Sequence, residues 1–160
     1  MSSRSNALAD RLAQGAQALA AFAGNLTESE WQTKVPHDGR TIGVIVHHVG
    51  SVYPIEIHIA SELAAGRALT GVTPEGINEM NAEHARTNGA VTKAEAIDLL
   101  VRNSADAATA IRAFSDAQLD GAATVSLYGE APLTCQFVLE DHAVRHSYHH
   151  LALIRGALQQ

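Results

Sequence analysis

The sequence predicts an all-α protein, a four-helix bundle with one or two additional short helices. Apolar residues recur at helical spacing in four long segments, and alternating runs of Val, Ile and Thr, which are typical of strands, are scarce. Alanine, the best helix former, is abundant, whereas aromatic residues make up 4% of the chain. With 160 residues, 46% of them hydrophobic, the chain has the size of a single domain that covers residues 1–160.

The first long helix is expected over residues 6–23. Its leucines recur at helical spacing, and the following Gly24 is a typical C-terminal stop. Residues 27–30 have the pattern of a capping box, which predicts a single helical turn after the first helix. Pro36 and the Asp-Gly pair at 38–39 then predict a loop.

The second long helix is expected from Thr41, a plausible N-cap, to about Ala65. Pro54 lies inside this segment and predicts a kink, because proline lacks the N–H that the helix needs. The Thr-Pro pair at 73–74 is typical of an N-cap followed by the first helical residue, and predicts a shorter helix through about Arg86.

Two further helices complete the predicted bundle. A capping box at 92–95 opens the third long helix, and a similar box at 115–118 predicts a short turn. The apolar stripe expected on the third long helix consists of Ile97, Leu100, Val101, Ala108 and Ile111. Residues 121–132 are the only strand-like segment, read as a small hairpin or an extended loop, and the last helix is expected over 133–158.

Composition excludes several classes of partner. Seventeen acidic and eleven basic residues give a net charge of −6, which is unfavourable for binding nucleic acid or an anionic membrane. We find no apolar stretch that approaches the ~18–20 residues of a membrane-spanning helix, and no export signal. The single cysteine, Cys135, cannot form an internal disulfide, so we expect a cytoplasmic location and a buried, unreactive thiol.

Histidines are the most informative residues. The chain has nine, and four of them lie within nine consecutive residues of the last helix: His142, His146, His149 and His150. A helix turns about 100° per residue, so His142 and His150 lie about 40° on either side of His146. Leu139 and Leu153 lie within roughly 20° of His146 on the same count, which predicts that the histidines interrupt the core-facing stripe.

Several buried imidazoles need a partner, because an unpaired buried polar group costs on the order of 1–3 kcal/mol. Imidazoles at i and i+4 stand about 6 Å apart along one face and can converge on one divalent cation. A single ion can therefore use one adjacent pair of the last helix, with a third ligand from another helix. On the second long helix, His48 lies at the edge of the apolar face, whereas His47 lies roughly opposite it.

Glu56 falls near the centre of that apolar face. A buried carboxylate needs a partner, so Glu56 is a candidate hydrogen-bond acceptor for a ligating histidine or a candidate general base. It could equally pair with an arginine of a neighbouring helix.

The alternative to a metal site is a set of core histidines bonded to backbone carbonyls or to one another. We expect structural or surface positions for His142 and His149, and solvated side chains for His47 and His58. His37 and His84 carry no signal, and Asn78 and Asn81 are either pocket residues or local caps.

Two segments, HHVGSVYP and DHAVRHSYHHLALIRG, resemble the DinB-like superfamily, which includes YfiT-like proteins and S-transferases and isomerases that use mycothiol or bacillithiol. The resemblance covers nearly the whole chain and implies a three-histidine metal site on His48, His146 and His150. The additional His47 and His149 leave the register of these ligands open by one residue. The resemblance also implies that the bound ion is divalent, zinc or nickel, with iron and manganese as further candidates. It implies in addition that the protein is a homodimer.

The function that follows is a divalent-metal-dependent enzyme acting on a small molecule. The resemblance implies a low-molecular-weight thiol as co-substrate, in an S-transferase or isomerase, with a hydrolase as a further possibility. The alternative is a non-catalytic metal-binding bundle that serves in stress response or dimerisation. Nothing in the residues themselves identifies a thiol-binding pocket.

Overall fold

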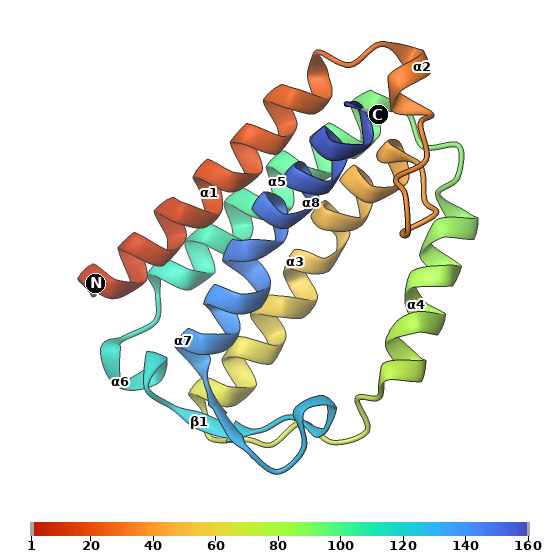
Figure 1. Cartoon of the computed structure of the whole chain (residues 1–160). Coiled ribbons are helices and arrows are strands. Elements are labelled where there is room, and N and C mark those ends of the chain that lie inside the picture. The colour runs from red at the N-terminus through yellow and green to blue at the C-terminus, as the bar shows by residue number, and fades with distance from the viewer. Residues whose placement is uncertain (1, 160) are drawn as a thin grey trace.

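The computed structural model describes residues 2–159 and is a four-helix bundle with a small hairpin at one end (Figure 1). The long helices of the bundle are α1 (Ser3–Gly24), α3 (Ile42–Ala64), α5 (Lys93–Arg112) and a last helix made of α7 (Cys135–Val138), the π-helical segment η2 (Leu139–Val144) and α8 (Arg145–Ala157). The predicted fold class is confirmed.

The shorter elements are α2 (Glu28–Trp31), α4 (Pro74–Thr87), α6 (Asp116–Leu119), the strands β1 (Ala122–Thr124) and β2 (Pro132–Thr134), and the 3-10 turn η1 (Ser126–Tyr128). The strands pair antiparallel, with Ala123 opposite Leu133, so the strand-like segment forms the hairpin rather than an extended loop. Because Leu133 belongs to this hairpin, the last helix begins at Cys135, two residues later than predicted.

Hydroxyl side chains define most of the helix starts. Each N-cap oxygen accepts a backbone N–H of the first turn, which would otherwise lack a partner. The predicted caps that do so are Thr27, Thr41, Thr73, Thr92 and Ser115. These boundaries were predictable because the capping contacts are local in sequence.

The core lies between α1, α3, α5 and the last helix. α3 and α5 approach closely at Gly50, where a Cβ atom would lie 2.8 Å from the backbone nitrogen of Leu100. Leu100 and Ile111 are fully buried as predicted, but Val101 is 52% exposed, so its place in the apolar stripe of α5 was wrong. It follows Leu100 by one residue, about 100° around the helix.

The π-helical segment η2 changes the orientation of the last helix. A π turn contains more residues than an α turn, so the residues before it are rotated relative to those after it. The uniform 100° count therefore misplaced the core-facing stripe: Leu153 is 37% exposed, and the buried side chains of α8 are Ser147, His150, Leu151 and Ile154. His146 lies at the edge of this buried face rather than at its centre.

α3 is the most apolar helix. By length and composition alone it is long and apolar enough to cross a membrane, which corrects the expectation that no such stretch exists. Of its most apolar window, 61% is buried inside the bundle, and the core helix of a water-exposed bundle gives the same pattern. It is the one such helix among residues 2–159.

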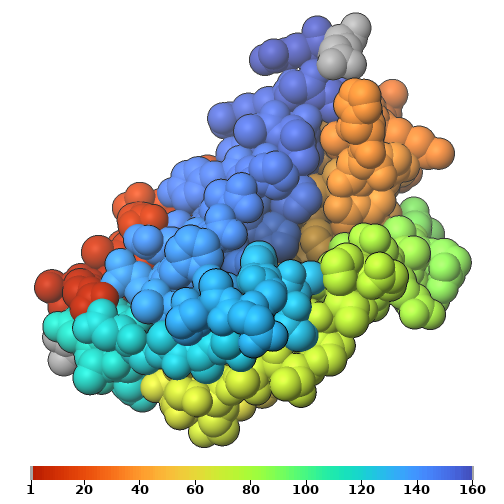
Figure 2. Space-filling view, turned by 60° about the horizontal axis from the view of Figure 1, so that its bottom comes forward, coloured from red at the N-terminus to blue at the C-terminus, as the bar shows by residue number. Residues whose placement is uncertain are grey.

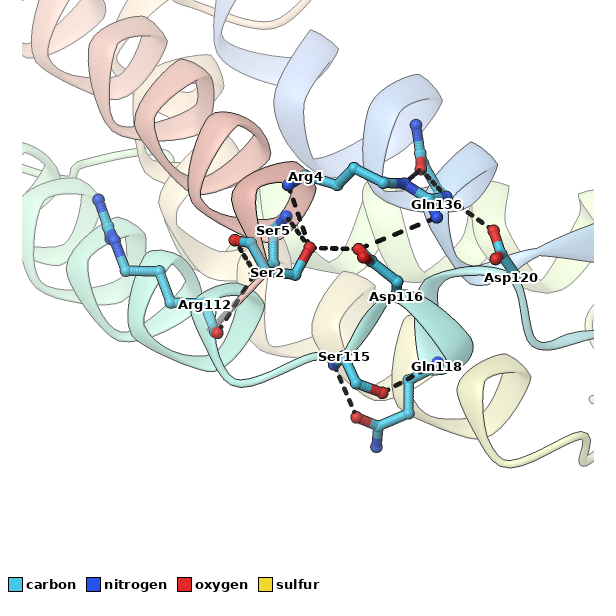
Figure 3. A network of polar contacts seen from close by, with 9 residues as sticks. All are labelled: Ser2, Arg4, Ser5, Arg112, Ser115, Asp116, Gln118, Asp120 and Gln136. Carbon is cyan, nitrogen blue, oxygen red and sulfur yellow. Dashed lines mark hydrogen bonds and ion pairs between the residues drawn. The ribbon is translucent and has the colours of Figure 1, made fainter.

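A polar network ties the first residues of α1 to the α6 and α7 region (Figure 3). The Arg4 guanidinium donates to Asp120, with Nη2 and Oδ1 2.7 Å apart, and to the amide oxygen of Gln136. Ser2, the N-cap of α1, donates to Asp116. These contacts hold the N-terminal end of α1 against α6 and α7, at the end of the bundle where the hairpin lies.

α4 stands to one side of α3 instead of joining the bundle (Figure 1). None of its side chains is buried. Its Pro74 end lies near the hairpin and its other end near the start of α3, so it runs beside the histidine-bearing part of α3.

Candidate metal centre

The structure brings His48 of α3 together with His146 and His150 of α8. One ring nitrogen of each residue lies within 4.8 Å of those of the other two. The ring centroids are 5.3 Å apart for His48 and His146, 5.6 Å for His48 and His150, and 4.8 Å for His146 and His150. His48 and His150 are buried, and His146 is half-buried. The side chains predicted to converge from two helices therefore do so.

This donor set fits a divalent cation. Metal–imidazole bonds of about 2.0–2.1 Å require the ligating nitrogens to lie about 3.0–3.4 Å apart, so the rings would have to move closer together around an ion. Nδ1 of His150 is buried and has no hydrogen-bond partner among the described residues, so a buried polar atom at the site is left without a partner. Imidazoles at the edge of an apolar core, contributed by two rigid helices, form a preorganised site.

The electrostatics keep two of the rings neutral. Burial lowers the pKa of His48 to about 2 and that of His150 to about 3. The positive charge of Arg40 contributes to both of these shifts. Neutral imidazole is the form that binds a metal ion, because the ligand nitrogen must be free of its proton.

Glu56 contacts the same group. Its Oε1 lies 2.5 Å from Nδ1 of His146, which leaves Nε2 of that ring for the cluster. A carboxylate on the far nitrogen fixes the tautomer and orientation of a ligating histidine. Glu56 is buried, and its Oε2 has no hydrogen-bond partner among the described residues. The predicted carboxylate partner of a histidine is therefore present; its role as a general base stays a prediction.

His47 and His84 form a second histidine pair, which was not predicted. Nδ1 of His47 and Nε2 of His84 lie 2.8 Å apart, and the rings stack with centroids 5.0 Å apart. Both are half-buried, so the expected solvation of His47 was wrong. Burial lowers the pKa of both rings, to about 4 for His84. The pair joins α4 to α3 beside His48, whose ring centroid is 5.5 Å from that of His84.

Arg40 is a further residue at the site that was not predicted. Its Nε and Nη2 donate to the two carboxylate oxygens of Asp38 at 2.7 and 2.8 Å. Nη1 is buried without a partner among the described residues. Burial is the main cause of the lowered pKa of His48, His84 and His150, and the charge of Arg40 contributes to each of these shifts. In the sequence it was part of a segment read only as a loop.

The other singled-out residues lie outside the three-histidine group. His142 is half-buried and its Nε2 hydrogen-bonds the hydroxyl of Tyr128 on the hairpin. His149 and His58 are exposed, as expected. Cys135 is fully buried, and burial raises the pKa of its thiol to about 11, consistent with an unreactive side chain. A cavity of about 610 Å³ opens beside the cluster, and Asn81 is among its lining residues.

The fold and the site together define a helix bundle with a three-histidine group between two of its helices. The chain matches the DinB superfamily over residues 11–154. It therefore belongs to the DinB superfamily, as the histidine-containing segments indicated.

One solved structure with the same fold is that of YfiT from Bacillus subtilis, with a TM-score of 0.78 and 16% sequence identity. The match covers 99% of this chain and 89% of that one. YfiT is described as a probable metal-dependent hydrolase with an unusual four-helix bundle topology. No curated protein matches the chain. At this identity the similarity establishes the fold alone.

Proposed function

We propose that the protein is a divalent-metal-dependent enzyme that acts on a small molecule, with His48, His146 and His150 as the metal ligands. The observation that carries the proposal is the convergence of these imidazoles, two of them buried and neutral, beside a cavity. Three protein ligands with an open position are typical of catalytic rather than structural zinc sites. A bound ion would lower the pKa of a water or thiol at the open position and polarise a substrate oxygen.

The residues of the chain have separate roles in this proposal. Glu56 holds Nδ1 of His146 and so directs Nε2 into the site. Its free Oε2 and its place in the cavity wall make it the candidate acceptor for a proton from the attacking group.

Hydrolysis is the reaction we favour. The description of YfiT supports it, and water needs no recognition site of its own. A thiol-dependent S-transferase or isomerase remains the second candidate, on the resemblance to that part of the superfamily. Turnover of ester, amide and electrophile panels with and without added small thiols separates the two reactions. The non-catalytic bundle predicts metal content but no turnover in either condition.

The proposal includes assembly and location. We expect a homodimer on the resemblance to the superfamily, and a cytoplasmic location because a single cysteine suits a reducing compartment. The net charge of −6 supports a small-molecule substrate over nucleic acid.

Elemental analysis of protein purified without a histidine tag tests the metal site and identifies zinc, nickel, iron or manganese. We expect about one ion per chain in the wild type, and loss of the ion in His48→Ala and His150→Ala, because two imidazoles hold a divalent ion poorly. His149→Ala is the matched control, since this side chain is exposed and next to His150 in sequence. Stoichiometric metal in a folded His150→Ala variant would show that the assignment is wrong.

A further inference from the structure

The cavity beside the histidine cluster is built mainly by apolar side chains. It has a volume of about 610 Å³ and lies between α3, the loop after it, α4, the hairpin and the last helix. Figure 2 shows the hairpin region in cyan lying between α4 in green and the last helix in blue on this face of the molecule. Apolar residues from these elements include Val52, Ile55, Ile59, Leu69, Ile77 and Met80.

The cavity is elongated along α3. His48 and Ile59 both line it, and eleven residues of α-helix separate them by about 16 Å. His146, which lies next to His48, is also in its wall. One end of the cavity thus reaches the candidate metal ligands, and the other extends toward Ile59 and Leu69, away from them.

Parts of the apolar lining remain open to solvent. Ile55 and Met80 are each 43% exposed, and Tyr128 is 39% exposed. Burying apolar surface stabilises a complex by about 25 cal/mol per Å². A concave apolar surface that is open to solvent is therefore typical of a binding site. A volume of this size matches the pockets of roughly 300–1,000 Å³ that hold small-molecule ligands.

The charges of the wall restrict the kind of ligand. Among the described residues that line the cavity there is no Lys or Arg, and the carboxylate present is Glu56, which His146 partners. A strongly anionic ligand body would therefore find no counter-charge along the apolar part. A ligand with an apolar body and a polar reacting group would match the cavity. Its body would contact the apolar side chains, and its reacting group would lie at the His48 end.

We propose that this cavity binds the extended alkyl or aryl body of an uncharged small-molecule substrate, with the reacting group directed toward His48 and His146. The proposal rests on the proposed function and names its substrate class. A small molecule is favoured over a second copy of the chain because the site is a concave cavity lined by five segments rather than a flat face.

The proposal is tested by measuring the affinity of the metal-free protein for a series of alcohols by calorimetry or NMR titration. The alcohols are butanol, hexanol, octanol and decanol. We expect affinity to rise roughly fourfold for each added methylene until the chain fills the cavity. In Met80→Asp, a charge in the apolar wall should weaken octanol binding at least about tenfold, the effect of one buried side-chain contact. α4 has no buried side chain, so this variant should fold normally, which its melting temperature would verify.

Val101→Asp is the matched control, because Val101 is also exposed, 52% against 43% for Met80, but lies on α5, outside the cavity wall. Octanol should bind this variant as it binds the wild type. Affinity that is independent of chain length, or an unchanged affinity in Met80→Asp, would overturn the proposal. The proposal would also be overturned if the protein were a dimer that binds no alcohol and in which hydrogen exchange shows the cavity to be covered by the interface. The occupant of the cavity would then be a second copy of the chain.

The alcohol titration is independent of the metal, so the two proposals fail separately. Metal content without binding of the alcohols would overturn the apolar substrate class and leave the metal-dependent function intact. Binding of the alcohols by a protein that takes up no metal would overturn the metal-dependent function, and the cavity would then serve ligand binding alone.

Discussion

The two sides of the bundle differ in how their buried polar atoms are satisfied. Where α1 packs against α5, the interior consists of leucine, alanine and isoleucine side chains, and the buried Ser5 and Ser104 donate to backbone carbonyls. On the α3, α4 and α8 side, four buried side-chain atoms have no partner among the described residues: Arg40 Nη1, Glu56 Oε2, His84 Nδ1 and His150 Nδ1.

This difference separates stability from function. Buried polar groups in folded proteins are almost always hydrogen-bonded, so each exception needs an explanation. Here the exceptions lie on one side of the bundle, and one of them, Glu56, lines an apolar cavity that is open to solvent. The α1–α5 side therefore supplies folding energy, and the α3–α8 side carries groups arranged for a ligand.

The largest effect, on the free energy of unfolding, is expected when a substitution removes a buried side chain between α1 and α5. Leu12 of α1 is fully buried, so Leu12→Ala should lower the free energy of unfolding by about 2–5 kcal/mol. The metal content of the remaining folded protein should be unchanged, because Leu12 lies outside the site. Denaturant unfolding and elemental analysis measure the two quantities. Loss of metal from folded Leu12→Ala protein would show that the two sides are not separable.

The sequence predicted the local features of both sides. Thr41 and Thr92 define helix starts through contacts within four residues, so their pattern is sufficient. His48 was preferred over His47 as a core-edge residue because α3 is continuously α-helical from Ile42 through both residues, so angular counting holds there. His146 and His150 keep their relative position because both follow the π-helical segment.

The failures have tertiary causes. The π-helical segment η2 depends on how the last helix packs, so its rotation of Leu139 relative to Leu153 could not be counted from sequence. His84 and Arg40 reach the site from α4 and from the loop before α3, whose placement depends on long-range contacts. His84 lies in the last turn of a mostly polar helix, where a histidine is ordinary because it interacts favourably with the helix dipole, so no local pattern set it apart.

An intermediate effect is expected at the carboxylate that supports His146. Glu56→Gln keeps the shape of the side chain but removes the charge that orients the ring, so metal affinity should fall about 10–100-fold. Glu62→Gln is the matched control on the same helix, because Glu62 pairs with Arg67 on the surface. Competition with a chromophoric chelator measures both affinities.

Equal affinities in these two variants would show that Glu56 does not position a ligand. Weakened binding in Glu56→Gln alone, with an unchanged melting temperature of the metal-free protein, would sharpen the contrast between the two sides of the bundle. It would mean that a buried polar contact on the α3–α8 side acts on the ligand and not on the fold.

The smallest effect is expected from releasing α4. His84→Ala removes the hydrogen bond to His47, worth about 0.5–1.5 kcal/mol, from a helix that buries no side chain. Hydrogen exchange of α4 should accelerate by roughly threefold to tenfold, while exchange in α1 and α5 and the global free energy of unfolding stay unchanged. Arg86→Ala, whose partner is the neighbouring Glu83 on the same helix, is the control and should leave exchange near the wild-type rate. If His84→Ala failed to accelerate hydrogen exchange in α4, or destabilised the whole bundle, α4 would be an integral part of the fold rather than a wall of the cavity.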